Sequence, residues 1–430
     1  MITVIGAGLA GCEAAHQIAK KGIQVRLIEM KPKKKSPAHT SDGFAELVCS
    51  NSLRAAAITN AVGLMKEEMR RLDSLIMEAA DKTSVAAGGS LAVDRHLFSE
   101  YITNAIRNNP LIEVEEREVD SLSEIKGICV VATGPLTSGG LYDEVGRLTG
   151  DKLHFFDAAA PIVSRESINM EKVFFASRWG KGDADYLNCP MTKEEYDAFY
   201  QALISAECAE LAGFEDDSVF EGCLPVEVMA KRGYETLLYG PLKPVGLFDE
   251  EGKKSYAVVQ LRREDAEGTM FNLVGFQTHL KFPEQKRVFA LIPGLEKLEI
   301  VRYGVMHRNT YINSPGILDR NYRLIKNNNI FFAGQMTGVE GYIESAASGL
   351  YAGLSAAAQA MEEELPFLSN KTTLGAMAEY ISSWAGSDFQ PMNINFGIMA
   401  PLEMRIRNKK EKNTKIAERA LAEIDAFRSR

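Results

Sequence analysis

The pattern of apolar and polar residues at the start of the chain predicts a strand, a glycine turn, a helix and a second strand. An apolar run at residues 2–5 leads into the glycine-rich residues 6–11, a helical pattern covers residues 12–21, and a second apolar run at residues 25–28 ends at Glu29. Buried parallel strands are short apolar runs of this kind, and a glycine turn between strand and helix is typical of dinucleotide-binding units. We therefore expect a Rossmann-type βαβ unit here.

The glycine spacing in this turn has a physical explanation in a nucleotide site. Gly6 can form the tight turn, Gly8 lets the backbone approach a pyrophosphate, and Gly11 lets the helix pack closely on the strand. Glu29 stands where a carboxylate can accept from ribose hydroxyls, and the helix N-terminus faces the phosphates. The residues that we expect to bind the cofactor in this unit are Gly6, Ala7, Gly8, Leu9, Ala10, Gly11, Glu29 and Lys31.

Helical and strand periodicity continue along the first third of the chain. Apolar residues at helical spacing predict one amphipathic helix at residues 61–80, and Asp94 opens a helix over residues 93–106. The apolar residues 128–132 predict a buried strand that stops at a turn containing Gly134. A doubly wound sheet needs such a strand beside its nucleotide.

A second strand–glycine–helix pattern appears far downstream. Residues 330–332 predict a strand that runs into Gly334, and small residues at 345–349 lie on the helix that follows. We expect those small residues to let the helix backbone approach a large flat ring. Two such elements serving one nucleotide favour FAD over NAD, because FAD is long and its flavin end is held separately. The residues expected to bind FAD in this half are Gly134, Gly334, Gln335, Gly338, Glu340, Gly341 and Tyr342.

The character of the sequence changes between these two patterns. Residues 153–302 combine short strand-like runs, at 173–176 and 257–261, with one clear helical pattern at 193–211. We predict an α/β fold: a glutathione-reductase-like Rossmann FAD-binding domain with a doubly wound parallel sheet, interrupted by an inserted α+β domain. The FAD-binding domain takes residues 1–152 and 303–430, and the insertion, residues 153–302, carries substrate contacts.

Composition and charge exclude several classes of protein. The 430 residues have a net charge of -9, 46% hydrophobic residues and six scattered cysteines without CxxC spacing. We therefore expect no disulfide framework and no zinc site, and a location in the reducing cytoplasm. Because the chain enters its predicted first strand at once, we expect no signal peptide.

Two basic clusters run against the negative total. Each is either a solvated face or a patch that follows phosphates, since binding a polyanion needs a local field and not a positive net charge. The clusters are Lys31, Lys33, Lys34 and Lys35, and Arg405, Arg407, Lys409, Lys410, Lys412 and Lys415.

The sequence around Cys49 is more specific than any glycine pattern. Together with several later segments it resembles the TrmFO family of folate- and FAD-dependent tRNA (uracil-5-)-methyltransferases, and the resemblance spans essentially the whole chain. The segments that carry it are residues 44–54, 60–63, 66–70, 92–96, 222–227, 334–342 and 393–401.

This resemblance implies a reaction. The uridine at position 54 in the T-loop of tRNA would be methylated at C5 with carbon from 5,10-methylenetetrahydrofolate. Reducing equivalents would come from FADH2, recharged by NAD(P)H, without S-adenosylmethionine.

Two cysteines gain a role through the resemblance. Taken alone, each cysteine of the chain is more simply a small buried hydrophobe. The resemblance implies that Cys223 is the nucleophile that attacks uracil C6, and that Cys49 is a second essential cysteine for proton handling or control of the flavin. Tyr342 could stack on flavin, folate or an extruded base. His96 and His307 are candidate acid–base groups, for which a structural role is the simpler interpretation.

Four other functions remain to be weighed against this one. The same chemistry could act on a ribosomal RNA uridine, and the sequence does not separate the two substrates. The larger GidA type of tRNA-modifying enzyme has an additional C-terminal domain that 430 residues do not accommodate. A flavin disulfide reductase would need a closely spaced cysteine pair. A non-enzymatic FAD-bound RNA-binding protein would keep its function without Cys223.

Overall fold

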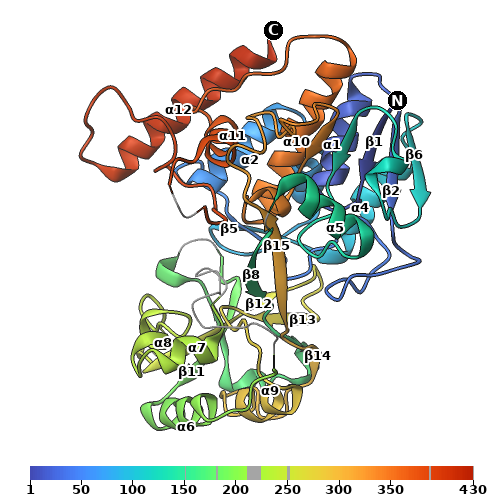
Figure 1. The fold of residues 1–430 in the computed structure, drawn as a ribbon. Coiled ribbons are helices and arrows are strands. Elements are labelled where there is room, and N and C mark those ends of the chain that lie inside the picture. Colours follow the sequence, from blue (N-terminus) through green and yellow to red (C-terminus); the bar gives the residue numbers. More distant parts are fainter. Residues whose placement is uncertain (151, 181–182, 211–223, 249–251, 387–388, 430) are drawn as a thin grey trace.

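The computed structural model describes residues 1–150, 152–180, 183–210, 224–248, 252–386 and 389–429. Figure 1 shows two lobes: an upper lobe with both termini and a parallel sheet, and a lower lobe with an antiparallel sheet. The larger hydrophobic core draws on residues 2–145 and 311–424, and the smaller core on residues 160–298. We keep the proposed division into residues 1–152 with 303–430 and residues 153–302, because its boundaries fall between these two sets.

A five-stranded parallel sheet organises the upper lobe. Its order is β6-β2-β1-β7-β16, so strands from the two ends of the chain lie side by side. This sheet confirms the expected α/β class, because the glycine turns follow the carboxyl ends of β1 and β16. The strands are β1 (Ile2–Ile5), β2 (Val25–Glu29), β6 (Ile112–Glu116), β7 (Cys129–Val131) and β16 (Ile330–Phe332).

Two long helices from distant parts of the sequence pack together beside this sheet (Figure 1). They are α1 (Leu9–Lys20) and α10 (Tyr342–Ala360). A Cβ atom added at Gly349 would lie 2.2 Å from the Ala10 carbonyl oxygen, and one added at Gly353 would lie 2.8 Å from that of Ala14. The small residues of α10 therefore admit another helix. Our expectation that they admit a flat ring is wrong for Gly349.

The other elements of the upper lobe surround this pair. A small antiparallel sheet has the order β3-β5-β4 and packs near α2 and α3. These elements are β3 (Ser52–Ala55), β4 (Ser84–Val85), β5 (Ser90–Val93), α2 (Ala61–Arg71), α3 (Leu75–Lys82), α4 (Arg95–Arg107), α5 (Gly139–Thr149), α11 (Thr373–Ser383) and α12 (Lys409–Arg428).

The helix predicted at residues 61–80 is two helices. Asp73 adopts a left-handed backbone with φ of 56°, which an α-helix does not accommodate. Ser74 then caps α3, its hydroxyl accepting a hydrogen bond from the Met77 N–H at 3.2 Å. The apolar spacing continues across the break, so periodicity alone did not predict it.

The lower lobe is built on a six-stranded antiparallel sheet of order β10-β11-β12-β13-β9-β14. The helix predicted at residues 193–211 ends at Ile204. The backbone of Cys208 instead forms an isolated antiparallel β-bridge with Leu280. The elements are β9 (Ile162–Ser164), β10 (Phe174–Ala176), β11 (Tyr186–Met191), β12 (Ala257–Arg263), β13 (Met270–Leu273), β14 (Ile300–Arg302), α6 (Lys193–Ile204), α7 (Val226–Lys231), α8 (Thr236–Tyr239) and α9 (Phe282–Phe289).

A two-stranded antiparallel ribbon connects the lobes. It pairs β8 (Lys152–Ala158) with β15 (Met306–Ile312), the two segments at which the chain leaves and re-enters the upper lobe (Figure 1). Among the described residues, we find no helix both long and apolar enough to cross a membrane.

Candidate functional site

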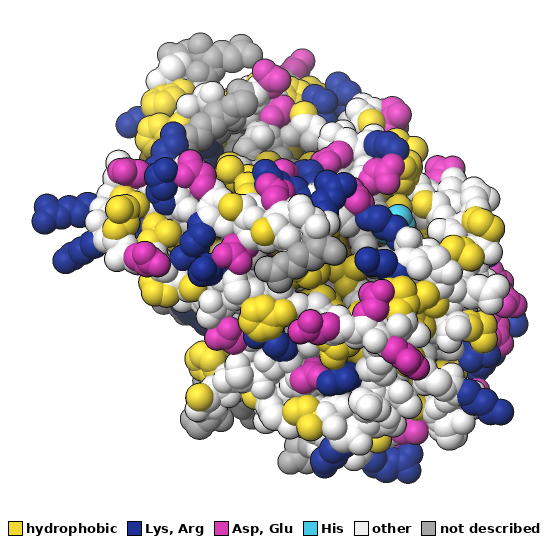
Figure 2. Space-filling model, turned by 90° about the horizontal axis from the view of Figure 1, so that it is seen from above, with side chains coloured by type: hydrophobic (Ala, Val, Ile, Leu, Met, Phe, Trp, Pro, Cys, Tyr) yellow, Lys and Arg dark blue, Asp and Glu magenta, His cyan; other side chains and the backbone are white. Residues whose placement is uncertain are grey.

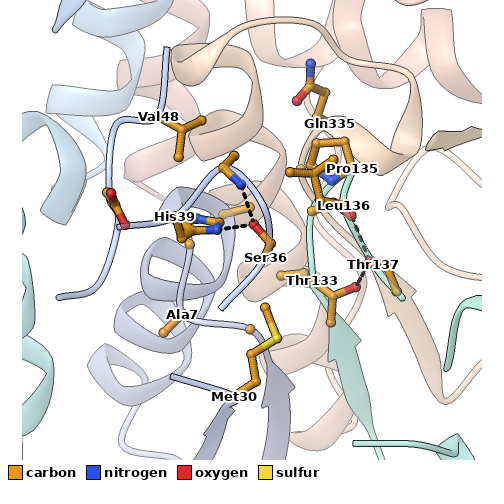
Figure 3. Close-up of a pocket in the computed structure, with 18 of the residues that line it drawn as sticks. Ala7, Met30, Ser36, His39, Val48, Thr133, Pro135, Leu136, Thr137 and Gln335 are labelled. Atoms are coloured by element: carbon orange, nitrogen blue, oxygen red, sulfur yellow. Dashed lines mark hydrogen bonds between the residues drawn. The ribbon is translucent and has the colours of Figure 1, made fainter. Parts of the chain in front are cut away.

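A large cavity opens at the carboxyl ends of the parallel strands. Its empty volume is about 1440 Å³, including the open solvent at its mouth. Its wall is formed by residues of β1, β2, the turn after β7, the β8–β15 ribbon and the starts of α1 and α10. Figure 3 shows Ala7, Met30, Ser36, His39, Thr133 and Gln335 facing this cavity from several elements.

The glycine turn after β1 lies in the cavity wall, and its three glycines have different surroundings. Gly6 has φ of 96°, and a Cβ atom there would lie 2.6 Å from the Ala132 carbonyl oxygen. A Cβ atom at Gly11 would lie 1.8 Å from the Gly6 oxygen, whereas one at Gly8 would meet nothing within 4 Å. Gly8 therefore faces open space beside the first turn of α1, where a ligand can approach the backbone.

Glu29 holds the turn as well as lining the cavity. Its side chain is 6% exposed, and its two oxygens accept hydrogen bonds from the Ala7 N–H at 2.6 Å and the Lys31 N–H at 3.0 Å. Each carboxylate oxygen has a second lone pair, so Glu29 can still accept from ribose hydroxyls. Lys31 lines the same wall and is 4% exposed, with its ammonium group against the Gly43 carbonyl oxygen.

The second glycine pattern meets the first one across the cavity. Gly134, Gly334, Gln335 and Tyr342 all line it, as do Leu9 and Ala10. The Gly334 N–H donates to the hydroxyl of Ser348 on α10 at 2.7 Å, which fixes this turn to the helix. Of the small residues at 345–349, the cavity wall includes Ser345.

Four expected cofactor residues lie outside the cavity wall, in supporting positions. Gly11 permits the close turn described above. A Cβ atom at Gly338 would lie 2.5 Å from the Phe389 ring, and one at Gly341 would lie 2.4 Å from a carboxylate oxygen of Glu344. Glu340 accepts a hydrogen bond from the side chain of Gln335, and so it orients a residue that does line the wall.

Cys49 lines the cavity and is tied to the start of α10. The Tyr342 hydroxyl accepts hydrogen bonds from the N–H groups of Cys49 at 2.6 Å and Ser50 at 3.2 Å. Burial, and then the nearby Cys49 sulfur, raise the pKa of Tyr342, so its hydroxyl is protonated. The Cys49 Sγ lies 3.4 Å from the carbonyl oxygen of Ala158. Two distant segments therefore place this thiol in the cavity.

Three arginines from three elements bind the backbone and side chains around Cys49. Arg95 on α4 donates to the Leu47 carbonyl, Arg302 on β14 donates to the Val48 carbonyl at 2.6 Å, and Arg262 on β12 donates to the Ser50 hydroxyl at 2.7 Å. Glu264 forms a 2.8 Å ion pair with Arg95. Burial lowers the pKa values of Arg262 and Arg302, and the nearby Cys49 sulfur acts weakly in the opposite direction. Burial also disfavours the charge on Arg95, but the Glu264 carboxylate and other neighbours, the Cys49 sulfur among them, raise its pKa.

Sequence reasoning missed these arginines, except that Arg95 lies in a segment of the resemblance. Arg262 and Arg302 stand in strands of the lower lobe without a recognisable motif, so only the tertiary structure reveals them.

Two histidines of the cavity are held neutral. Burial and the charge of Lys31 lower the pKa of His39, whose ring nitrogen lies 2.6 Å from the Ser36 hydroxyl (Figure 3). Burial and the charge of Arg302 lower the pKa of His307. His307 was a candidate from the sequence, whereas His39 was not. His96 follows the N-cap of α4 and is outside the cavity wall.

The remaining cysteines divide by burial. Cys223 lies outside the described residues. Burial raises the pKa values of Cys12, Cys129 and Cys189, which suits the structural role expected for them. Cys208, also expected to be structural, lies beside His279 and Glu227.

The chain has relatives among known proteins. Residues 1–364 match the family described as glucose inhibited division protein A. A methylenetetrahydrofolate–tRNA-(uracil-5-)-methyltransferase TrmFO from Listeria monocytogenes is 60% identical over 425 residues, covering 98% of both chains. The chain belongs to the TrmFO family. A TrmFO from Desulfitobacterium hafniense is also 60% identical, over 100% of this chain and 98% of its own.

The fold of this TrmFO family member has a relative among solved structures. Aquifex aeolicus GidA superimposes with a TM-score of 0.71 at 16% identity, covering 99% of this chain and 73% of the GidA chain. At that identity the likeness concerns the fold. It confirms the expected architecture of a parallel sheet with an inserted domain.

Proposed function

We propose that this protein is a folate- and flavin-dependent methyltransferase that converts the uridine at position 54 in the tRNA T-loop to 5-methyluridine. The observation that carries the proposal is the 60% identity to TrmFO proteins over nearly the whole chain. The cavity that joins a dinucleotide-binding turn to Cys49 supports it. The carbon donor is 5,10-methylenetetrahydrofolate, and NAD(P)H is the external reductant.

The residues of the cavity fit FAD. The open space at Gly8, the first turn of α1 and the carboxylate of Glu29 suit a pyrophosphate and a ribose. Gly334, Gln335 and Tyr342 would hold the flavin end. When bound, FAD supplies the reducing equivalents that bring a methylene group to the methyl level.

The chain itself supplies the groups that activate uracil. Uracil C5 is a poor nucleophile until a thiolate adds to C6, which places carbanion character at C5. We assign this addition to Cys223. C5 then bonds to the one-carbon unit and loses its proton, and the bond between that unit and its carrier nitrogen breaks as the reducing equivalents are delivered. The Cys223 sulfur leaves C6 as the ring double bond re-forms. We assign proton handling at C5 to Cys49, which the Tyr342 hydroxyl and Arg262 hold in place through the adjoining backbone and Ser50.

The RNA is recognised by shape and phosphates. A base in a folded loop has to leave its stack before a thiolate can reach C6. The exposed basic residues at the start of α12 are the candidate phosphate contacts, and Figure 2 shows basic side chains extending from the edge of the molecule where α12 begins.

The test is an incubation of the purified holoprotein with unmodified tRNA transcript, NADPH and methylenetetrahydrofolate labelled in its methylene carbon. We expect labelled 5-methyluridine in the nuclease digest of the tRNA, and none in a transcript whose T-loop uridine is replaced by cytidine. The variant Cys223→Ala should bind the tRNA without methylating it. Label in ribosomal RNA alone would move the activity to that substrate. Label in neither RNA would contradict the proposal.

A further inference from the structure

Two guanidinium groups next to Cys49 are removed from solvent without a carboxylate beside them. Arg262 is 6% exposed, and Arg302 is half-buried. Both donate to neutral groups adjoining Cys49: Arg262 to the Ser50 hydroxyl at 2.7 Å, and Arg302 to the Val48 carbonyl at 2.6 Å. Of the carboxylates that the structure describes, none lies within 4.0 Å of either guanidinium. Since buried charges are normally paired, we expect a counter-charge at this place.

Arg262 is fixed at the junction of the two lobes by Asn51. The Asn51 side chain is fully buried, and its oxygen accepts a hydrogen bond from the Arg262 Nε at 2.9 Å. Its nitrogen donates to the Val93 carbonyl at 3.0 Å and to the Arg263 carbonyl at 2.9 Å. Val93 ends β5 of the upper lobe, and Arg263 ends β12 of the lower lobe. Because Asn51 is itself held by both lobes, it keeps the guanidinium of Arg262 beside Ser50.

Two pairs of opposite charge near Cys49 already cancel within themselves. Arg95 on α4 forms its ion pair with Glu264 at 2.8 Å. On the cavity wall, a carboxylate oxygen of Glu46 lies 3.9 Å from the ammonium group of Lys31. Both carboxylates also attract the two guanidinium groups from farther away, but each has a cation of its own. Neither pair therefore supplies the full counter-charge.

The other titratable neighbours of this thiol carry no charge. Burial raises the pKa of Tyr342 at the start of α10, so its hydroxyl is protonated. The two histidines of the cavity are neutral, because burial and nearby cations lower their pKa values. The charges of Arg262 and Arg302 are thus left in excess.

The Cys49 sulfur can supply the missing negative charge. Burial lowers the pKa values of Arg262 and Arg302, and this sulfur is among the groups that act against burial. A thiol beside arginines ionises more readily than a free one. One contact favours the protonated form, since the Ala158 carbonyl oxygen lies 3.4 Å from the Sγ, but a thiol is only a weak donor. We expect two cations to outweigh this one bond.

We propose that Cys49 rests as a thiolate whose charge balances Arg262 and Arg302, and that Arg262 is the positioning residue that sets this ionisation. The inference rests on the proposed function, in which Cys49 handles the proton at C5, because a base has to be unprotonated before it accepts. The C5–H bond then breaks and an S–H bond forms. The electron pair left on carbon re-forms the ring double bond as the nucleophile leaves C6.

The test is a pH titration of Cys49 in the holoprotein. Iodoacetamide alkylates thiolates, the sulfur bonding to carbon as iodide leaves, and mass spectrometry of the Cys49 peptide gives the rate at each pH. Ultraviolet thiolate absorbance, compared between wild type and Cys49→Ser, is a second titration that needs no reagent access. The variants are Arg262→Gln and Arg262→Lys, with Arg178→Gln as the control. Arg178 is a half-buried arginine of the same lobe that donates to Gln260 at 2.9 Å.

The expected midpoints differ between the variants. Wild-type Cys49 should titrate about one pH unit or more below the value near ~8.5 of an ordinary thiol. Arg262→Gln should raise the midpoint by about one unit, which lowers the alkylation rate at neutral pH by up to ~10-fold. Arg262→Lys should keep most of the wild-type behaviour, because the charge stays, and Arg178→Gln should keep all of it. Tm and flavin absorbance report folding. Arg302→Gln should shift the midpoint in the same direction, and it replaces Arg262→Gln if that variant does not fold.

Three results would overturn the inference. A wild-type midpoint at or above the ordinary thiol value does so without any variant. A folded Arg262→Gln protein that titrates like wild type does so as well. Equal shifts in Arg262→Lys and Arg262→Gln would mean that Arg262 supplies hydrogen bonds and not charge. Methylation of tRNA judges the proposed function separately: a low Cys49 midpoint in an inactive protein would contradict that function and support the charge balance.

Discussion

Two glycines three residues apart in the turn after β1 have opposite surroundings. Gly11 is enclosed by the chain, with the Gly6 carbonyl oxygen 1.8 Å from a hypothetical Cβ atom, whereas Gly8 faces the cavity with nothing within 4 Å. The sequence pattern predicted an enclosed Gly11 and an accessible Gly8, because the turn is local and its geometry is set by residues close in sequence; the binding of a pyrophosphate at Gly8 stays a prediction. It could not reveal that Glu29 also pins the turn through the Ala7 N–H.

This contrast leads to a prediction for two alanine variants. Gly8→Ala should leave the Tm of the apoprotein nearly unchanged and weaken FAD binding, because its methyl group occupies the space that a pyrophosphate would use. Gly11→Ala should lower the free energy of unfolding by ~1–3 kcal/mol, since overpacking forces the backbone to move. Apoprotein melting and FAD titration distinguish the two. A Gly8→Ala variant that binds FAD as tightly as wild type would contradict the assignment of this turn to the cofactor.

Tyr342 offers a second test at the scale of one atom. Its hydroxyl oxygen accepts from two N–H groups, those of Cys49 and Ser50, so Tyr342→Phe leaves both donors without this partner. We expect the free energy of unfolding to fall by ~1–3 kcal/mol, measured by urea denaturation. The matched control is Tyr239→Phe, because Tyr239 is 79% exposed and should lose almost nothing. Equal losses in the two variants would argue against the described hydrogen bonds.

Element boundaries were predictable where the chain carries a local signal. The strands β1, β2 and β16 and the Asp94 cap of α4 follow from apolar runs and a capping residue. The break between α2 and α3 did not follow, because the apolar stripe is continuous and Asp73 adopts its left-handed backbone only in this tertiary setting. The packing partner of α10 was also missed, since a small-residue helix face does not say whether a helix or a ring covers it.

Glu68 on α2 links two elements and makes a pH-dependent prediction. It is fully buried and accepts hydrogen bonds from the Thr373 N–H at 2.8 Å and the Leu374 N–H at 3.1 Å, at the start of α11. Burial raises its pKa to about 7, although these bonds act in the opposite direction. An unfolded glutamate titrates near ~4.3. Between these values the folded protein holds a proton that the unfolded chain has lost, so stability falls as the pH rises.

The expected size follows from the two pKa values. Between pH 5 and pH 7.5 the wild type should lose on the order of 3 kcal/mol more than Glu68→Gln, whose side chain does not titrate. Urea denaturation at the two pH values measures this difference. Glu67→Gln is the control, because Glu67 lies at the surface side of the same helix with 30% of its side chain exposed. Parallel losses in wild type and Glu68→Gln would refute the prediction.

At the scale of the whole molecule, both lobes contribute side chains to the site around Cys49. Arg95 comes from the upper lobe, while Arg262 and Arg302 come from the lower sheet, and all three bind residues 47–50. Nothing in the sequence near Arg262 or Arg302 signals this, because the hydrogen bonds join residues more than two hundred positions apart. The motif around Cys49 could be recognised, but the partners that hold it could not.

The basic clusters also look different once the chain is folded. Lys34 and Lys35 form ion pairs with Glu118 and Asp42, and Lys31 is buried. In contrast, Lys409 and Lys410 are exposed at the start of α12, and over the described ranges neither takes part in an ion pair within 4.0 Å. We therefore expect the α12 cluster to bind phosphates of the RNA.

A charge-reversal experiment tests this expectation. The double variant Lys409→Glu and Lys410→Glu should weaken tRNA binding, and the slope of log K against log salt should become shallower by about 0.7–0.9 for each phosphate that the protein no longer neutralises. FAD content should not change. Lys34→Gln is the matched control, because its charge is already paired with Glu118. An unchanged salt slope in the double variant would exclude α12 from the RNA interface.

The side-by-side packing of α1 and α10 has a consequence for biosynthesis. The turn that begins the cofactor cavity is made first, but β16 and α10, which complete it, emerge only after the entire lower lobe has been translated. Until then the nascent chain lacks the helix that covers α1 at Ala10 and Ala14. Loading of the cofactor is thus a late event. A chain whose translation stops before α10 contains the glycine turn after β1 but binds no flavin.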